Sequence, residues 1–304
     1  TSRDNHEETV DFFRENHFFG LTPALVHIFP QNMIPSLDLD GKLILSDKST
    51  IFMNPDGHGG SLSALRSSGA LKLLEDMGIE VISYFQVDNP LVKIIDPIFI
   101  GFHILNKADV SSKALMKAYH EEKTGVFVRF KNGKLGIIEY SDMPQEKIFA
   151  KDSEGGILYC AANPAIHLFD IKFVDKITGS SNVNLPYHVA KKKIEAFKDG
   201  QQCEITGLKF EKFVFDAIPM AEKTVILETK REEEFAPVKN ASGADSVHTA
   251  QAMMNALFRR WLSNRGVKIP DVVDVIEISP FFALQESDIP EGTIVPAQEK
   301  VYLE

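Results

Sequence analysis

Cysteine is scarce in this sequence. Among the 304 residues there are only two, Cys160 and Cys203. Two thiols can build neither the disulfide framework of a small secreted domain nor a four-ligand zinc site. The nine histidines follow neither an H-x-H nor an H-E-x-x-H pattern. This composition is typical of a reducing compartment, and we expect a cytoplasmic protein.

Long apolar runs and an excess of positive charge are also missing. No stretch reaches about 18 apolar residues, because the best run, residues 94 to 105, is interrupted by Asp96, Pro97 and Gly101. The formal net charge is −10. Nucleic-acid binding needs a basic surface, so we expect neither a nucleic-acid partner nor a membrane. A local cationic pocket for a small anion stays compatible with this charge.

The familiar phosphate-binding motifs are absent as well. No G-x-x-x-x-G-K-[ST] occurs, and the glycines at 57, 59 and 60 do not form G-x-G-x-x-G. With 44% hydrophobic and 25% charged residues, the chain is nevertheless an ordinary globular protein. Its length predicts about two domains.

The most informative stretch runs from Thr50 to Asp88. A short apolar strand, Thr50 to Asn54, precedes a glycine-rich turn, a helix from residue 61 to 77, and a second strand, Val81 to Val87. Such a unit favours two parallel strands with a right-handed crossover, which places the glycine loop and Asp88 at one edge of the sheet. A nucleotide-phosphate and metal site is one interpretation. A purely steric glycine turn, with Asp88 as a turn cap, is the other.

A hairpin is predicted over residues 125 to 140, around Asn132-Gly133. A two-residue turn would place Val126 opposite Glu139, and hence Glu139 on the apolar face. A buried carboxylate needs a partner. Glu139 is therefore either the partner of a buried Lys or Arg, or a ligand group.

Three loop residues are weaker candidates, and each has a plain structural alternative. A strand from Ala24 to Phe29 would deliver Gln31 to a loop, where it could bind a ligand or only solvent. Asn163 stands before a proline, which is more often turn chemistry. Lys239 follows a proline in a loop and could be an ordinary surface lysine.

The remaining segments indicate core and a small tail. Residues 210 to 218 form either a helix or a strand and are most simply core, and Thr224 to Glu228 is predicted to be a buried strand. The clearest helix begins at Asp245 and ends at Gly266. Strand-like pieces at 272 to 278 and 293 to 301 follow it. We therefore divide the chain into residues 1–266 and a small β-rich domain, 267–304.

Taken together, these segments resemble the eukaryotic-type UDP-sugar pyrophosphorylase family, most closely its UDP-N-acetylglucosamine pyrophosphorylase branch. The resemblance covers nearly the whole chain, and eight motifs keep their order. They are PDGHGG at 55 to 60, VDN at 87 to 89, DPIFIGF at 96 to 102, EYS at 139 to 141, HVAKKK at 188 to 193, EKFVFD at 211 to 216, REEEFAPVKN at 231 to 240 and EISP at 277 to 280.

The resemblance implies a fold and a reaction. The fold is α/β, a Rossmann-like, GT-A-like nucleotidyltransferase domain whose mixed sheet has helices on both faces, followed by the small C-terminal β domain. The reaction joins UTP and an N-acetylhexosamine 1-phosphate into a UDP-sugar and pyrophosphate, with Mg²⁺. UDP-glucose or broad UDP-sugar synthesis is the alternative, because His58 stands where the N-acetylhexosamine branch usually has Asn.

Site residues are implied by the same resemblance. Lys239 would reach the phosphates and Asp88 would bind Mg²⁺; these are the expected catalytic residues. The expected substrate-binding residues are Gln31, Met53, Pro55, Gly57 and His58 for uridine, and Gly125, Glu139, Asn163, Phe213 and Phe215 for the sugar.

One family element is not in this sequence. The glycine-rich loop G-G-x-G-T-R-L-G lies upstream of these motifs in the family, and the chain opens with Thr1. We expect the C-terminal part of a longer enzyme. The alternative is a fragment that binds a UDP-sugar without turnover. A metal-dependent glycosyltransferase is disfavoured, since Asp88-Asn89-Pro90 offers one carboxylate and not a D-x-D.

Overall fold

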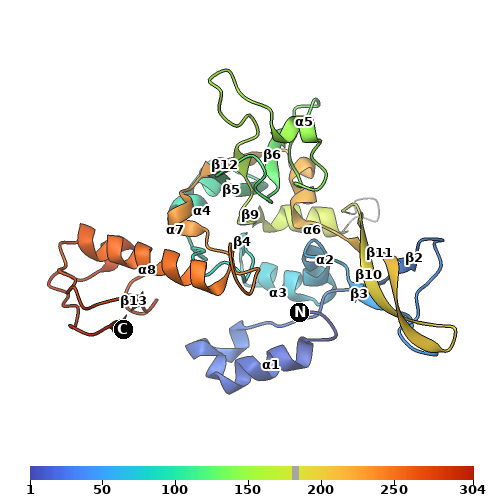
Figure 1. Cartoon of the computed structure of the whole chain (residues 1–304), viewed down its shortest axis with the longest axis horizontal. Coiled ribbons are helices and arrows are strands. Elements are labelled where there is room, and N and C mark those ends of the chain that lie inside the picture. The colour runs from blue at the N-terminus through green and yellow to red at the C-terminus, as the bar shows by residue number, and fades with distance from the viewer. Residues whose placement is uncertain (180–184) are drawn as a thin grey trace.

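A mixed sheet forms the centre of the protein in the computed structural model, which describes residues 1–179 and 185–304 (Figure 1). Its strands follow the spatial order β4-β9-β5-β8-β6-β7, and β12 pairs with β5. Only the β12–β5 pairing is parallel within this sheet. The strands are β4 (Val81–Tyr84), β5 (Val110–Met116), β6 (Val126–Arg129), β7 (Leu135–Ile138), β8 (Ala161–Ala162), β9 (His167–Asp170) and β12 (Thr224–Glu228).

Helices cover both faces of this sheet, as expected. Neighbouring residues of a strand point to opposite faces, and on β9 Leu168 packs with Phe99 of one helix while Phe169 joins the main core. The first face is covered by α4 (Pro97–Leu105), which Asp96 caps. The second face is covered by α2 (Gly60–Ser67), α3 (Ala70–Asp76), α6 (Ile171–Gly179) and the 3-10 helix η3 (Val214–Met220).

The predicted parallel strand-helix-strand unit is wrong. The first strand, β3 (Met53–Pro55), pairs antiparallel with β1 (Met33–Pro35) in a separate two-stranded sheet, whereas β4 pairs antiparallel with β9. The predicted single helix is two, because Gly69 takes a left-handed φ of 82° between α2 and α3. A short apolar run predicts a strand but does not identify its partner.

The β6–β7 hairpin is confirmed, but its register is shifted by one residue. Val126 lies opposite Ile138, and not opposite Glu139. Phe130 pairs with Lys134 through its N–H, and Gly133 takes a φ of 82°. The connection is therefore a three-residue loop with a left-handed glycine, and not the tight two-residue turn.

Three large elements differ from the prediction, which did not include them: β5, α6, and the ribbon of β10 (His188–Lys198) and β11 (Gln201–Glu211). The ribbon extends from the body of the molecule, and β2 (Leu37–Asp38) pairs with its β11 edge (Figure 1). The predicted strand at 24 to 29 is not formed. The N-terminal segment instead contains α1 (His6–Glu15), η1 (His17–Gly20) and η2 (Pro23–Leu25).

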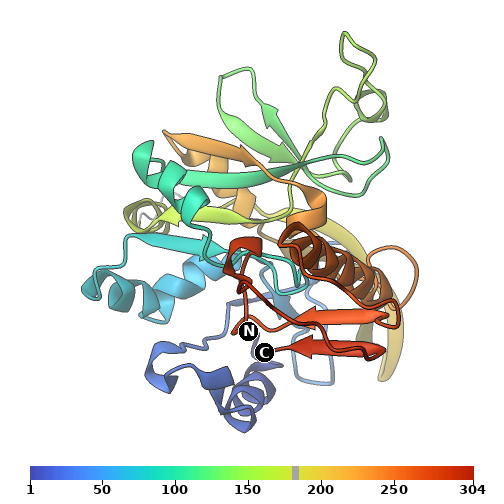
Figure 2. The ribbon, with the colours of Figure 1, turned by 90° about the vertical axis from the view of Figure 1, so that its left-hand side faces the viewer.

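The C-terminal part has a core of its own. Ser246 and Thr249 form a reciprocal cap that starts α8 (Val247–Asn264). Beside α8 lie β13 (Val275–Ile278) and β14 (Lys300–Leu303), which pair in parallel (Figure 2). Both strands are shorter than the predicted ones.

The remaining short helices are α5 (Gln145–Ile148), α7 (Arg231–Glu234) and η4 (Glu286–Asp288). Within the described residues no helix is long and apolar enough to cross a membrane.

Candidate active site

Asp88 and Lys239 come from distant parts of the sequence and lie side by side. The loop after β4 is held against residues 234 to 238 by Asn89, whose amide donates to the Glu234 carbonyl at 2.7 Å and accepts from the Ala236 N–H at 3.0 Å. The Val238 N–H donates to the Asp88 carbonyl at 2.8 Å. These bonds leave the Lys239 Nζ 4.0 Å from the Asp88 Oδ2.

A buried ion cluster anchors the segment of residues 234 to 238 on the sheet. Lys113 on β5 is fully buried and contacts Asp96 at 2.6 Å and also Glu234. The Thr229 hydroxyl donates to Glu234 at 2.6 Å. Buried charges are tolerated only when paired, so this cluster fixes the start of the 234 to 238 segment on the sheet. The sequence around Lys113, Ser-Ser-Lys-Ala-Leu, contains no pattern that would predict a buried lysine.

Glu139 lies at the end of β7 and is half-buried. Burial raises the pKa of its carboxyl, and the neighbouring charge of Asp142 raises this pKa further. The charges of Lys239 and His188 act in the opposite direction. Glu139 therefore lies within electrostatic range of Lys239, which itself lies beside Asp88. The predicted register, which placed Glu139 on the apolar face, was wrong.

Gly125 and Asn163 line up beside Glu139. A Cβ on Gly125 would lie only 2.7 Å from the Glu139 Oε1, so a larger residue at this position would displace the Glu139 side chain. The Asn163 N–H donates to the Gly125 carbonyl at 2.9 Å. The Asn163 side-chain oxygen accepts from the Ala165 N–H at 3.0 Å, which is the turn chemistry named as the alternative for this residue.

The glycine loop packs against the end of β11. A Cβ on Gly57 would lie 2.5 Å from the Lys212 carbonyl oxygen, and one on Gly59 would lie 2.6 Å from the Phe213 carbonyl carbon. The Gly59 N–H donates to the Lys212 carbonyl at 2.8 Å. Close packing against this backbone explains why both positions are glycine, which is the steric interpretation. The same packing joins the loop to the segment that carries Phe213.

His58 is a neutral ring with a defined tautomer. Its Nδ1 lies 3.2 Å from the Val214 backbone nitrogen, which can only donate, so Nδ1 accepts and the proton is on Nε2. The Tyr84 hydroxyl also lies 3.2 Å from Nδ1. Burial lowers the pKa of His58 to about 4, with the charge of His188 as a second cause. At neutral pH His58 is therefore a hydrogen-bond donor and not a cation.

The two predicted phenylalanines have different surroundings. Phe213 is half-buried and stacks on His58 with ring centroids 5.2 Å apart. Phe215 is buried in the main core and touches Phe213 with centroids 5.0 Å apart. Phe213 is the better placed of the two to meet a ligand.

The three remaining uridine candidates lie along one short ribbon. Met53 and Pro55 are on β3, and Pro55 pairs with Met33 of β1. Gln31 stands two residues before that strand and is half-buried. β3 leads directly into Gly57 and His58, and the pairing of β1 with β3 brings the distant Gln31 segment alongside them.

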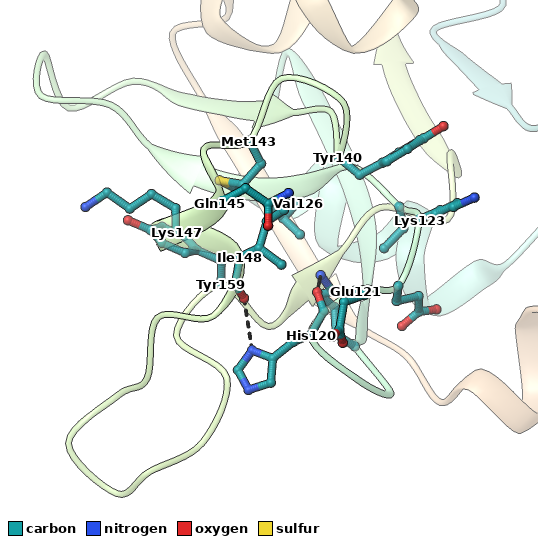
Figure 3. A pocket seen from close by; sticks show the side chains of 13 residues that line it. His120, Glu121, Lys123, Val126, Tyr140, Met143, Gln145, Lys147, Ile148 and Tyr159 are labelled. Carbon is teal, nitrogen blue, oxygen red and sulfur yellow. Dashed lines mark hydrogen bonds between the residues drawn. The ribbon is translucent and has the colours of Figure 1, made fainter.

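A separate pocket of about 210 Å³ is lined by Thr124 and Val126, the residues on either side of Gly125 (Figure 3). Its walls are the 117 to 124 loop, the end of the β6–β7 hairpin and α5. His120 bridges two of these walls through a 2.9 Å hydrogen bond to the Ile148 carbonyl. None of the predicted site residues lines this pocket, but Thr124 does, and its hydroxyl donates to the Asn163 carbonyl at 3.3 Å.

Comparison with known proteins decides the family. The family model described as UTP–glucose-1-phosphate uridylyltransferase matches residues 1–282. The chain belongs to this uridylyltransferase family. The resemblance inferred from the motifs is thereby confirmed.

The uridylyltransferase relatives most similar to the chain include two curated proteins. UDP-N-acetylglucosamine diphosphorylase 2 of Arabidopsis thaliana is 38% identical over 92% of the chain and 57% of its own length. UDP-N-acetylhexosamine pyrophosphorylase-like protein 1 of Homo sapiens is 39% identical over 86% of the chain and 53% of its own length. The chain thus spans about half the length of these relatives.

A solved uridylyltransferase structure has the same fold. The crystal structure of the uridine diphosphate N-acetylglucosamine pyrophosphorylase from Trypanosoma brucei, in complex with an inhibitor, is 26% identical with a TM-score of 0.84. The match includes 99% of this chain and 65% of the chain in that crystal structure. The mixed α/β architecture expected from the sequence is confirmed at this level.

Proposed function

We propose that this chain provides the uridine- and sugar-binding part of a pyrophosphorylase that makes UDP-N-acetylhexosamine and pyrophosphate from UTP and N-acetylhexosamine 1-phosphate. The observation that carries the proposal is that Lys239 lies 4.0 Å from Asp88 and within electrostatic range of Glu139. Family membership and the names of the relatives support the uridylyl transfer and the N-acetylated sugar.

The reaction needs no covalent enzyme intermediate. A phosphate oxygen of the sugar 1-phosphate attacks the α-phosphorus of UTP, the new P–O bond forms, and the bond to the leaving pyrophosphate breaks. Catalysis of this kind consists mainly of positioning and charge stabilisation. Lys239, whose side chain is 52% exposed, would balance the charge on the transferred phosphate. Glu139, when ionised, would accept hydrogen bonds from sugar hydroxyls.

Asp88 is a suitable ligand for Mg²⁺. Magnesium prefers carboxylate oxygens and commonly binds through one or two of them together with substrate phosphates. Asp88 offers one carboxylate, whose Oδ2 lies 4.0 Å from the Lys239 Nζ. A bound Mg²⁺ would supply charge neutralisation at the phosphates.

Two alternatives remain, each with its own support. UDP-glucose or broad UDP-sugar synthesis is supported by His58, because a neutral Nε2–H donor replaces the amide usual in the N-acetylhexosamine branch. A non-catalytic UDP-sugar-binding role is supported by the fact that the chain spans about half of its relatives.

Two measurements separate these functions. Calorimetry with UDP-N-acetylglucosamine and UDP-glucose tests binding by the chain itself, and a preference for the first ligand is expected. Pyrophosphate release from UTP with a panel of sugar 1-phosphates tests turnover. Binding without pyrophosphate release would favour the non-catalytic role. Failure to bind any uridine nucleotide would contradict the proposal.

A further inference from the structure

His188 and Asp216 form a hydrogen-bonded pair that the proposed reaction does not use. His188 is the first residue of β10, and Asp216 lies in η3. The His188 Nε2 is 2.8 Å from the Asp216 Oδ2. The side chains are 31% and 16% exposed, so the pair is partly shielded from water but open on one side.

The His188 ring packs on Phe213. The ring centroids are 4.4 Å apart and the planes are tilted by 34°. The Asp216 N–H donates to the Phe213 carbonyl at 3.2 Å, so the carboxylate and the phenyl ring belong to the same turn. Asp216 therefore orients His188, and His188 limits the angles that the Phe213 ring can adopt.

The pair also lies among the charges of the candidate site. Glu139 and Asp142 approach from the end of β7, Lys239 from the loop after α7, and His58 from the glycine loop. The charge of His188 lowers the pKa of Glu139, and the charge of Asp142 raises the pKa of both Glu139 and Asp216. Burial is the main cause of the raised pKa of Asp216, and its bond to His188 opposes this.

We propose that His188 and Asp216 are a positioning pair that fixes the Phe213 ring at the sugar end of the site and so sets the preference among UDP-sugars. This inference rests on the proposed function. The Phe213 ring packs on both His58 and His188, and a ring held at one angle keeps its remaining apolar surface constant for the sugar. The acetamido methyl of UDP-N-acetylglucosamine gains most from such a face, because burial of apolar surface stabilises the complex. UDP itself gains nothing from it.

The test is calorimetry of the chain with UDP, UDP-N-acetylglucosamine and UDP-glucose. His188→Asn and Asp216→Ala should each weaken UDP-N-acetylglucosamine binding about 3- to 10-fold, the effect of losing one oriented aromatic contact. UDP affinity should stay within about twofold, so the preference over UDP-glucose falls. Asp216→Asn keeps an acceptor for the His188 N–H and should retain most of the preference. The matched control is His248→Asn on the exposed face of α8.

An equal loss for all three ligands, or an unchanged preference in His188→Asn, would overturn the proposal. Thermal unfolding of each variant identifies those that fail to fold. If the unaltered chain binds neither UDP nor a UDP-sugar, the proposed function fails. The positioning claim is then decided by the NMR signals of the Phe213 ring. They should change in His188→Asn and Asp216→Ala but not in His248→Asn, and unchanged signals would refute it.

Discussion

At the scale of single residues, Lys239 carries the sharpest expectation. Its amine is the cation closest to Asp88, and one charge contact to a phosphoryl transition state contributes about 10²-fold to the rate. Lys239→Ala should therefore slow pyrophosphate release by about that factor. Lys191→Ala, on the exposed side of β10, is the matched control. Unchanged turnover in Lys239→Ala would remove this lysine from the active site.

Glu139 should show a conflict between stability and binding. Its pKa is raised in the folded state, so the folded protein binds more protons than the unfolded chain, and stability falls as pH rises from the ordinary carboxyl pKa through the raised one. Glu139→Gln should therefore raise the thermal midpoint at pH 7 by a few degrees and leave it unchanged at low pH.

The same substitution should weaken UDP-sugar binding, because an ionised acceptor is lost. In the unaltered protein UDP-sugar affinity should fall on acidification at a higher pH than for an ordinary glutamate. Calorimetry across a pH series measures both effects. A lower thermal midpoint for Glu139→Gln at pH 7 would show that the carboxylate is a structural partner and not a ligand group.

The residues of the site could be predicted largely through resemblance. The hairpin pattern indicated that Glu139 needs a partner but could not identify Lys239, because the position of Lys239 depends on the hydrogen bonds of Asn89 to residues 234 and 236. In the sequence His188 stands out only as the first residue of the HVAKKK motif. Its role depends on Asp216, 28 residues away, and no local pattern encodes that distance.

At the scale of elements, the glycine loop can be tested by its close packing. Gly59→Ala would place a methyl group 2.6 Å from the backbone of Phe213, which cannot move without shifting η3. We expect a loss of several degrees in thermal midpoint together with weaker UDP-sugar binding. The matched control is Gly101→Ala in α4, where nothing lies within 4 Å. This control should stabilise the helix by about 0.5–1 kcal/mol. Equal effects of the two substitutions would contradict the packing argument.

The buried cluster on β5 makes a second prediction at this scale. Lys113→Met removes the cation that contacts both Asp96 and Glu234 and leaves Glu234 with the more distant Lys93 amine, 3.7 Å away. Breaking a buried pair costs about 3–5 kcal/mol. Lys193→Met removes an exposed pair with Glu204 and should cost less than about 1 kcal/mol. Urea denaturation measures both. Similar costs for the two variants would show that the cluster does not hold the 234 to 238 segment.

Elements were predictable where local chemistry determines them. The capped helix α8, the β6–β7 hairpin and the strand β12 were found because caps, turn residues and apolar runs are local signals. β5 was missed since two serines and a lysine interrupt its apolar residues, and only the tertiary partners of Lys113 explain its burial. The β10–β11 ribbon was missed because its exposed residues give it the pattern of a charged surface loop.

At the scale of the whole molecule, the C-terminal core decides how the chain divides. The cluster formed by β13, β14 and the segment between them also includes Phe258 and Leu262 from α8, which precede the proposed boundary at residue 266. A chain ending at 266 would expose these two side chains to water. We expect it to unfold at a lower temperature and to bind a hydrophobic dye, in contrast to a chain in which the exposed Phe281 is replaced by Ser. A truncated chain as stable as the full one would establish residues 267–304 as an independent domain. A large loss of stability would instead show that α8 and residues 267–304 form one folding unit. That unit directly follows the segment that carries Lys239.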